Sequence, residues 1–452
     1  MTGPEPTPRA APTRRGTVGR VPFPTVDEIS RHCLDEREPD TVHIEIHLPR
    51  RPDPERLRAA VDEALRRHSR ALVREAPTSW WGPHYRWELT EGADREAVSY
   101  PGGTLEDARA RSVSECPSLD ASPPLRIEVV EHRGAWVLVV SVNHTALDGP
   151  ACLRLLATTA EVYGGADNSP APAPVRPPSD AVPRQPPAAG RTWARPARIA
   201  PDAHTPGVNG NGMLLVQLPV PSRPPRDTGG EARYTVNDQL LVATCVTAMR
   251  WNREHRAPAR PVRITMPVDD RTRGTEMPIG NGTRLVEVTF HPEERELYQA
   301  LTAPEGPDHQ AVVRMLHATA ARTRALKSVN RPQLGLSGAL LTSPLLPVGL
   351  RRIGVRALRR AAGAWSSTTL LSNIGRVPYP MDFGDAGRTG AVWISAPARR
   401  PRGLSVTTVS VGGRVQVALR WSRARLDDEA GERLASEFAR SLAATSHQEG
   451  DL

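Results

Sequence analysis

The chain has 452 residues, enough for two packed lobes that each bury a core of their own. Its formal charge of +9 comes mostly from arginine and would suit nucleic acid, anionic lipid or an acidic protein partner. Sparse aromatic residues and the absence of a zinc-finger, basic-zipper or aromatic RNA-binding signature argue against nucleic acid. We interpret the charge as a general basic surface rather than a dedicated docking face.

The sequence contains no stretch of about 18 consecutive apolar residues and no apolar run suited to a signal peptide. We therefore expect a soluble, cytoplasmic protein without a transmembrane segment. Residues 1–20 are rich in Pro, Gly and Arg, which predicts a disordered basic tail. The four cysteines are scattered without C-x-x-C spacing, so we expect free, structural thiols.

The first structured segment is a predicted strand at residues 42–48, where apolar and polar residues alternate. This alternation is typical of a half-buried strand, so we interpret His43 and His47 as residues of its solvent-facing side. A helix follows at once, because Asp53 is a good N-cap and Pro54 fits the first helical position.

Two β-rich runs further along the chain predict an antiparallel hairpin formed by residues 125–130 and 136–142. The second run continues directly into residues 143–149, which read Asn-His-Thr-Ala-Leu-Asp-Gly. Residues 151–163 then show a helical pattern. The heptapeptide is therefore predicted to form a strand-to-helix loop, a position from which side chains can face a cleft.

Residues 166–211 are dominated by Pro, Ala, Gly and Arg, which is typical of an extended linker. We place the boundary between two lobes there, with an N-terminal lobe at 21–165 and a C-terminal lobe at 212–452. Thr235 and Asp238 form a capping-box variant at the start of a helix. The other predicted elements are strands at 213–218, 262–266, 285–290, 404–411 and 415–421, and helices at 311–327 and around 434–442. Both lobes are therefore predicted to be α+β.

His144 is the candidate catalytic residue of the predicted loop. A histidine with a pKa near neutrality can take a proton from a hydroxyl or amine if its ring is held at the right angle and in the right tautomer. Asp148 is well spaced to tie the loop down through an arginine rather than to touch the substrate. We predict His144 to be a general base, and we consider a backbone N–H near Gly149 as a donor to the oxyanion.

The loop resembles the His-His-x-x-x-Asp-Gly signature of condensation domains and related acyltransferases, whose second histidine matches His144. These relatives include the wax ester synthase and diacylglycerol acyltransferase group, polyketide-associated acyltransferases and, more distantly, chloramphenicol acetyltransferase and the plant BAHD enzymes. Further similar segments occur in family order over residues 40–445. They are TVNDQLL at 235–241, PVDDR at 267–271 followed by Gly280-Asn281, LSNIG at 371–375 and GLSV at 403–406.

The resemblance implies an α+β fold of two chloramphenicol-acetyltransferase-like lobes arranged as a V-shaped pseudo-dimer. His144 would lie at their junction, in a tunnel open on both faces through which donor and acceptor enter from opposite sides. The resemblance also implies that Arg271 is the ionic partner of Asp148. Removing such an arginine would leave a partly buried charge without compensation.

Four further residues are assigned through the resemblance. Asn143 stands where most condensation domains have their first histidine, and its amide can still form hydrogen bonds that orient the loop. Asn237, Ser372 and Asn373 are candidates for the environment of the substrate or of the oxyanion. The alternative for these three is a purely structural role at a helix start and in a strand.

We predict an acyltransferase that moves an acyl group from a thioester donor to a hydroxyl or amine of a small-molecule acceptor in secondary metabolism. The donor would be acyl-CoA or a phosphopantetheinyl carrier protein acting as co-substrate, with no bound cofactor and no metal. Two alternatives stay open. One is a lipid-directed O-acyltransferase of the wax ester or diacylglycerol type, and the other is a catalytically silent module that recruits a partner.

Residues 348–360 combine apolar residues with five arginines. Such a segment would suit docking of an acidic acyl or peptidyl carrier protein, or of anionic lipid. We interpret it instead as an ordinary surface helix whose arginine stems lie along apolar surface.

Overall fold

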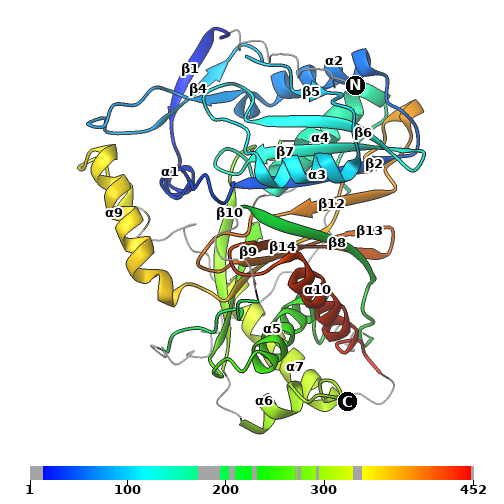
Figure 1. The fold of residues 1–452 in the computed structure, drawn as a ribbon. Coiled ribbons are helices and arrows are strands. Elements are labelled where there is room, and N and C mark those ends of the chain that lie inside the picture. The colour runs from blue at the N-terminus through cyan, green and yellow to red at the C-terminus, as the bar shows by residue number, and fades with distance from the viewer. Residues whose placement is uncertain are drawn as a thin grey trace, which may run out of the picture.

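The computed structural model describes residues 14–171, 194–202, 209–225, 232–269, 271, 276–291, 295–328, 338 and 340–448. Two α+β lobes lie one above the other, with the N-terminal lobe at the top and the C-terminal lobe at the bottom of Figure 1. None of the described helices is long and apolar enough to cross a membrane.

The N-terminal lobe is built on a five-stranded sheet with the strand order β12-β2-β7-β6-β5. Helices α2 and α4 pack on each other and on one face of the sheet, and α3 packs on the other face. As predicted, the side chain of Asp53 caps α2 by accepting the Arg56 N–H at 2.8 Å. The elements are β2 (Thr41–Leu48), β5 (Val98–Ser99), β6 (Leu125–His132), β7 (Ala135–Asn143), β12 (Ala391–Ser395), α2 (Pro54–Arg67), α3 (Leu105–Ser114) and α4 (Gly149–Gly164).

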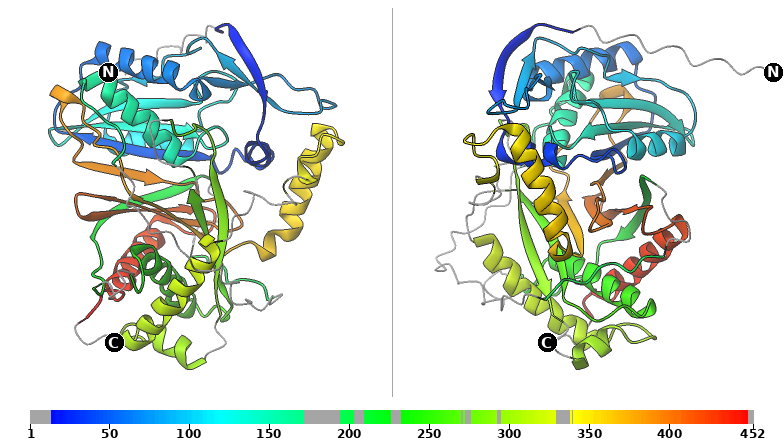
Figure 2. Two further views of the ribbon diagram at one scale, coloured as in Figure 1. Left: turned by 180° about the vertical axis from the view of Figure 1, so that it is seen from behind. Right: turned by 60° about the vertical axis from the view of Figure 1, so that its left-hand side comes forward.

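The C-terminal lobe contains a six-stranded sheet with the order β10-β9-β11-β13-β14-β8, in which β11 runs parallel to both β9 and β13. Its core lies between this sheet and the helices α5, α7 and α10 (Figure 2). The elements are β8 (Asn211–Pro219), β9 (Val262–Asp269), β10 (Thr283–Phe290), β11 (Thr369–Arg376), β13 (Leu404–Val411), β14 (Arg414–Ser422), α5 (Val236–Glu254), α6 (Arg295–Leu301), α7 (His309–Ser328) and α10 (Asp428–Ala443).

A small sheet with the order β1-β4-β3 lies against the N-terminal lobe. Its first strand corrects the predicted tail, because residues 17–20 belong to β1 and pair with β4, while residues 1–13 lie outside the described residues. The remaining elements are β1 (Thr17–Pro22), β3 (Val73–Glu75), β4 (Arg86–Thr90), α1 (Thr25–His32), α9 (Val348–Ala361), and the short 3-10 turns η1 (Ser69–Ala71), η2 (Ala362–Trp365) and η3 (Gly384–Ala386).

Strand β12 crosses from the C-terminal half of the chain into the N-terminal lobe. It pairs antiparallel with β2, so that Val392 lies opposite Ile46 and Ile394 lies opposite Ile44. The two lobes are therefore joined by a shared sheet. Much of the predicted linker, at residues 172–193 and 203–208, lies outside the described residues, and the division of the chain into lobes at 166–211 stays a prediction.

The interpretation of the β2 histidines is wrong for His43, which is fully buried. Its Nδ1 lies 2.7 Å from Ser112 Oγ and its Nε2 lies 2.9 Å from Glu45 Oε1. Glu45 also accepts hydrogen bonds from Arg109 Nε at 2.7 Å and pairs with His47 Nε2 at 2.9 Å. The polar side of β2 is covered by α3, so it forms a buried hydrogen-bonded network instead of facing solvent.

This network predicts acid sensitivity. Burial alone would raise the pKa of Glu45, but the hydrogen bonds from His43, His47 and Arg109 outweigh it and hold the pKa well below its usual range. A depressed pKa adds stability above the unfolded value, about 4.3, and that stability is lost as the pH falls through the folded value. We expect Glu45→Gln to lower the free energy of unfolding at neutral pH by about 3 kcal/mol, because Arg109 loses its buried anion.

Urea unfolding of both proteins across this pH range tests the prediction. The difference in free energy of unfolding should shrink as the pH falls below about 4. The matched control is Glu36→Gln, at an exposed position, which should change the free energy by less than about 0.5 kcal/mol. A difference that is the same at every pH would contradict this account.

Candidate active site

The loop that carries His144 is held by hydrogen bonds on both sides of the residue. The His144 N–H donates to the Asp40 carbonyl at 2.9 Å. Asn143, which is buried, donates from Nδ2 to the Pro117 carbonyl at 2.9 Å and accepts the Thr145 N–H on Oδ1 at 3.0 Å. Asn143 therefore orients the loop through these two hydrogen bonds. It does not line the cavity between the lobes that is described below.

The imidazole of His144 is half-buried, and its Nδ1 lies 3.2 Å from the Leu147 carbonyl. A carbonyl can only accept, so this contact places the hydrogen on Nδ1 and leaves the lone pair on Nε2. No described residue forms a hydrogen bond with Nε2. The ring is therefore oriented by its own loop, and one nitrogen is left to accept a proton.

Asp148 joins the loop to the other lobe. Its side chain caps α4 by accepting the Ala151 N–H at 3.0 Å. Both carboxylate oxygens lie 2.9 Å from Arg271 Nη2, and Oδ2 also accepts the Gly282 N–H at 2.8 Å. With its carboxylate buried and engaged in these bonds, Asp148 has a positioning role.

Arg271 is held in place on the side of the C-terminal lobe. Its Nε donates to Asp269 at 2.9 Å, and its Nη1 donates to the Gly280 carbonyl at 3.1 Å. Burial alone would lower the pKa of Arg271, but the carboxylates of Asp148 and Asp269 outweigh it and raise the pKa. The guanidinium is therefore a fixed positive charge directed at the end of the loop that carries His144.

Asn281 connects the same loop to α1, a role that sequence reasoning did not assign. Its Nδ2 donates to the carbonyls of Thr145 and His144 at 2.9 and 3.2 Å and to Asp27 Oδ1 at 2.9 Å. Burial raises the pKa of Asp27, although Arg70 and Asn281 act in the opposite direction. The Gly280-Asn281 pair could be recognised in the sequence, but Asp27, which accepts a hydrogen bond from Asn281, lies far away in the sequence.

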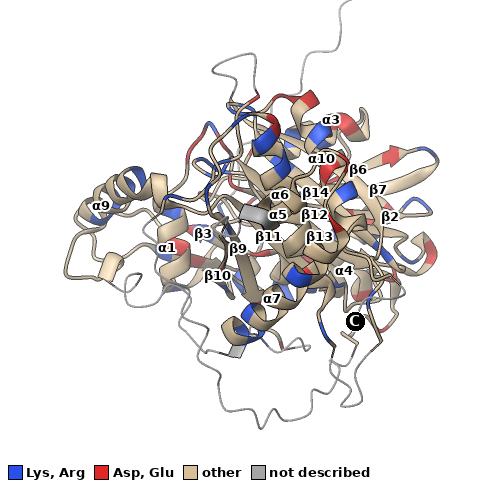
Figure 3. Ribbon diagram, turned by 90° about the horizontal axis from the view of Figure 1, so that it is seen from below, with Lys and Arg blue, Asp and Glu red and all other residues tan. Residues whose placement is uncertain are grey.

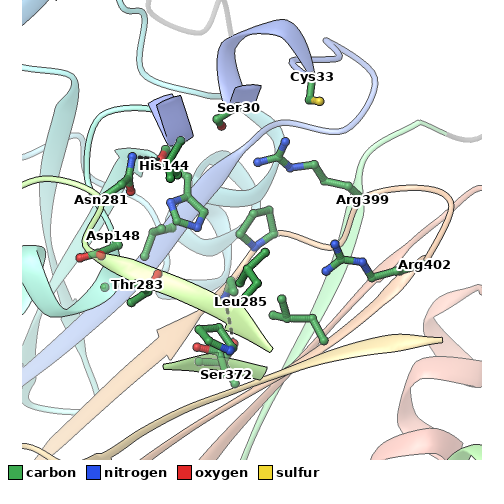
Figure 4. A pocket seen from close by; sticks show the side chains of 18 of the residues that line it. Ser30, Cys33, His144, Asp148, Asn281, Thr283, Leu285, Ser372, Arg399 and Arg402 are labelled. Atoms are coloured by element: carbon green, nitrogen blue, oxygen red, sulfur yellow. Dashed lines mark hydrogen bonds between the residues drawn. The ribbon is translucent and has the colours of Figure 1, made fainter. Parts of the chain in front are cut away.

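A cavity of about 520 Å³ lies between the lobes, and His144, Asp148 and Gly149 line it together with residues of α1, β9, β10 and β11. Among the residues assigned through the resemblance, Ser372 and Asn373 line the cavity, whereas Asn143, Asn237 and Arg271 do not. Figure 4 shows the His144 ring among the lining side chains. Across the described residues, no group of three His, Cys, Asp or Glu side chains is arranged to hold a metal ion.

The two asparagines near the cavity bond mainly to each other and to the strands. Asn373 Nδ2 donates to Asn237 Oδ1 at 3.2 Å, and Asn373 Oδ1 accepts from the Gly375 N–H at 2.9 Å and from Thr408 Oγ1 at 3.1 Å. These contacts favour the structural alternative for both residues. Of Asn237, Ser372 and Asn373, the residue best placed to contact a ligand is Ser372, which lines the cavity.

Two arginines give one wall of the cavity a positive charge. Arg399 forms an ion pair with Asp40, whereas Arg402 has no hydrogen-bond or ion-pair partner among the described residues. Figure 4 shows both guanidinium groups turned toward the cavity, across from His144. Burial and then the neighbouring Arg399 lower the pKa of Arg402 to about 10, so it stays protonated at neutral pH. The run Arg-Arg-Pro-Arg at 399–402 is the only sequence signal for this feature.

The close packing of Gly282 against Arg271 can be tested by substitution. A Cβ at Gly282 would lie 2.3 Å from Arg271 Nε, so Gly282→Ala must displace a guanidinium that Asp148 and Asp269 hold. We expect the free energy of unfolding to fall by about 1–3 kcal/mol in urea unfolding. The control is Gly354→Ala on an exposed helix, where no atom lies within 4 Å and alanine should be neutral or stabilising. Equal effects at the two glycines would contradict the close packing.

No protein-family model matches the chain. An uncharacterised protein of Mycobacterium tuberculosis is 28% identical over 432 residues, which cover 89% of this chain and 94% of that protein. Alcohol acyltransferase 16 of Actinidia chinensis is 34% identical over 88 residues, which is 19% of each chain.

The solved structures that are similar to this chain share its fold at low sequence identity. Trichothecene 15-O-acetyltransferase from Fusarium sporotrichioides has a TM-score of 0.63 at 11% identity, covering 97% of this chain and 100% of that one. The first condensation domain of the CDA synthetase has a TM-score of 0.59 at 17% identity, with 95% and 97% covered. The starter condensation domain of rhizomide synthetase, solved with C8-CoA, has a TM-score of 0.55 at 15% identity, with 90% of each chain covered. The predicted fold is confirmed: this chain has the two-lobed α+β fold of condensation domains and of trichothecene 15-O-acetyltransferase.

Proposed function

We propose that this protein is an acyltransferase that moves an acyl group from a thioester to a hydroxyl or amine in the cavity between the lobes. The observation that carries the proposal is the His144 imidazole, which lines the cavity with Nδ1 anchored on the Leu147 carbonyl. That anchoring leaves Nε2 as a proton acceptor with a fixed orientation, which is what general-base catalysis requires. His144 is the general base.

His144 is the only group that moves a proton in this reaction. Nε2 takes the proton from the acceptor O–H or N–H while the acceptor atom attacks the thioester carbonyl carbon. The tetrahedral intermediate collapses with cleavage of the C–S bond. The proton passes from Nε2 to the departing sulfur, so that an ester or amide and a free thiol leave. The enzyme carries no acyl group at any stage.

The negative charge on the tetrahedral intermediate requires a hydrogen-bond donor. Two groups that line the same cavity as His144 fit this role: the N–H of Gly149, in the first turn of α4, and the hydroxyl of Ser372. The N-terminal end of α4 adds a favourable electrostatic contribution for an anion. Asp148 caps that end, so its bond to Arg271 also fixes the position of the Gly149 N–H.

The donor is acyl-CoA or an acylated phosphopantetheine arm on a carrier protein. Both carry phosphate, and the guanidinium groups of Arg399 and Arg402 in the cavity wall suit such an anion. The rhizomide synthetase domain solved with C8-CoA supports the first donor. The second donor would make an acidic carrier protein a partner. We also propose a role in secondary metabolism with a small-molecule acceptor, in the cytoplasm.

A lipid-directed ester synthase is the second candidate function. It is favoured by apolar side chains in the cavity lining, among them Val26, Ile29 and Leu285, which suit a long acyl chain. A silent module fits less well, because the Leu147 carbonyl orients the His144 ring and Asn143, in place of the first motif histidine, still holds the loop through two hydrogen bonds.

His144→Ala should abolish catalysis. We expect release of free thiol from a panel of acyl-CoA and acyl-carrier-protein donors, mixed with hydroxyl and amine acceptors, to fall by roughly 10²–10⁴-fold. His132→Ala is the matched control, because His132 is at the far end of the β6–β7 hairpin that leads into the catalytic loop. Thiol release that survives in His144→Ala would contradict the proposal, and its absence in the wild-type protein with every donor would support the silent module.

Arg402→Gln separates anion recognition from chemistry. We expect the KM for acyl-CoA to rise roughly tenfold with kcat almost unchanged, because one charge-assisted hydrogen bond is lost. The same acyl group on N-acetylcysteamine carries no phosphate, so its KM should not change. Arg414→Gln, at an exposed hairpin position, is the charge-matched control. An equal rise in KM for both thioesters would show that Arg402 does not bind the phosphate.

A further inference from the structure

Helix α9 turns its apolar side toward solvent. Leu350, Ile353, Gly354, Ala357 and Leu358 follow the spacing of one helical face, and all five are exposed, with 44% exposure for Leu350, 55% for Ile353 and 50% for Leu358. The surface helices of a soluble monomer normally turn such a stripe toward the core. The interpretation of this segment as an ordinary surface helix therefore does not fit its orientation.

Polar contacts on the opposite side fix this orientation. Arg351 is buried, and its Nε lies 2.9 Å from Glu28 Oε1. Arg356 Nε and Arg359 Nη1 donate to backbone carbonyls at the C-terminal end of α1, at 3.1 and 2.8 Å. Rotating α9 to bury its apolar stripe would break all of these bonds. Figure 3, seen from below, shows α9 beside α1 at the edge of the molecule.

The exposed apolar surface continues onto two neighbouring loops. The N–H groups of Val348 and Gly349 donate to the carbonyls of Gly82 and Trp80 at 2.9 and 3.0 Å, which fixes the tryptophan loop against the start of α9. Trp81 is 72% exposed and Leu345 is 91% exposed. We call this surface the α9 face, and it consists of Trp80, Trp81, Leu345, Leu346, Leu350, Ile353 and Leu358. Figures 1 and 2 show α9 standing at the periphery of the molecule.

The charge around the α9 face is positive. No acidic residue occurs in the sequence between Asp308 and Asp382, and five arginines lie on α9. Burial and then the neighbouring Arg352, Arg31 and Arg360 lower the pKa of Arg356, so like charges crowd this helix. The acidic residues of the loop that follows α1 line a groove beside α9 together with Arg352, Arg356, Arg359 and Arg360, and none of the exposed apolar residues of α9 lines this groove.

We propose that the α9 face docks this protein on an anionic lipid surface. Tryptophan, leucine and isoleucine on one side, with exposed Arg360 seven residues after Ile353 at the border of the stripe, match the pattern of helices that lie in the membrane interface. A second copy of the chain would bring two arginine-rich helices together, which is unfavourable. An acidic carrier protein would need outward-facing charges at the centre of the contact, where this surface is apolar. The binding is peripheral, since no described helix can span a bilayer.

Docking at this face would bring the cavity next to the bilayer. Arg359, Ala362 and Gly363, at the C-terminal end of α9, line the cavity that contains His144. A substrate with a long acyl chain can then pass from the membrane to the site without crossing water. This last step rests on the proposed function, whereas the docking itself does not.

Vesicle co-sedimentation of the full chain tests the docking. We expect binding to vesicles of phosphatidylcholine with phosphatidylglycerol, weaker binding at high salt, and little binding to phosphatidylcholine alone. The double variant Ile353→Ser with Leu358→Ser should lose at least about tenfold in affinity, because two exposed apolar side chains no longer enter the interface. Arg360→Gln should lose about fivefold on anionic vesicles. Val18→Ser, at an exposed apolar residue outside the α9 face, should bind as the wild-type protein does.

The controls separate docking from folding and from catalysis. The melting temperature and the rate of thiol release from soluble acyl-CoA should be the same for the double variant and the wild-type protein. Failure of the proposed chemistry would leave vesicle binding intact, so the two proposals can fail independently. Three results would overturn the docking: no binding of the wild-type protein to anionic vesicles, equal binding by the double variant, or a dimer or an acyl-carrier-protein complex that the double variant abolishes.

Discussion

The bond between Asp148 and Arg271 is the interaction on which the site depends. One carboxylate caps α4, accepts the Gly282 N–H and receives both of its remaining contacts from a guanidinium of the other lobe. A carboxylate buried to this degree is costly unless charges and hydrogen bonds compensate it, and here the C-terminal lobe supplies the positive charge of Arg271 and the N–H of Gly282. The C-terminal lobe therefore helps to hold the end of the loop between β7 and α4.

Polar contacts at several positions hold the two lobes together around this bond, and the cavity lies beside them. Arg420 is fully buried and donates to the Thr41 carbonyl at 2.7 Å and to Asn211 Oδ1 at 2.6 Å. Burial lowers the pKa of Arg420 to about 10, so it remains a cation between the lobes. Strand β12 adds a continuous ladder of hydrogen bonds from the C-terminal half to β2. These contacts keep the lobes in register while His144 stays accessible from the space between them.

The parts of the structure that local sequence determines could be predicted, and the parts that depend on distant contacts could not. The cap of α2 by Asp53 and the reciprocal bonds of Thr235 and Asp238 at α5 involve neighbours in sequence, so residue type and spacing were sufficient. The pairing of β12 with β2 has no local signal. The alternating pattern of β2 predicted the strand but not the burial of His43, because α3 covers it from elsewhere in the chain.

The same distinction holds for the candidate site and for α9. The heptapeptide and the order of the similar segments pointed to His144, Asp148 and Arg271, whereas the contact of Asn281 with Asp27 joins residues that no spacing rule connects. The burial of Arg402 in the cavity wall, without an ion-pair partner among the described residues, likewise appears only in three dimensions. For α9 the sequence indicated an amphipathic helix, but periodicity does not say which side faces the protein.

A double-mutant cycle on Asp148 and Arg271 tests the central claim most directly, with the free energy of unfolding measured for Asp148→Asn, for Arg271→Gln and for the pair. If this bond joins the lobes and shapes the loop, the effects should be strongly non-additive, with a coupling energy of about 2–3 kcal/mol. The double variant should then be little worse than either single variant. Additivity within about 0.5 kcal/mol would show that the two residues act independently, and the account of the site would be wrong.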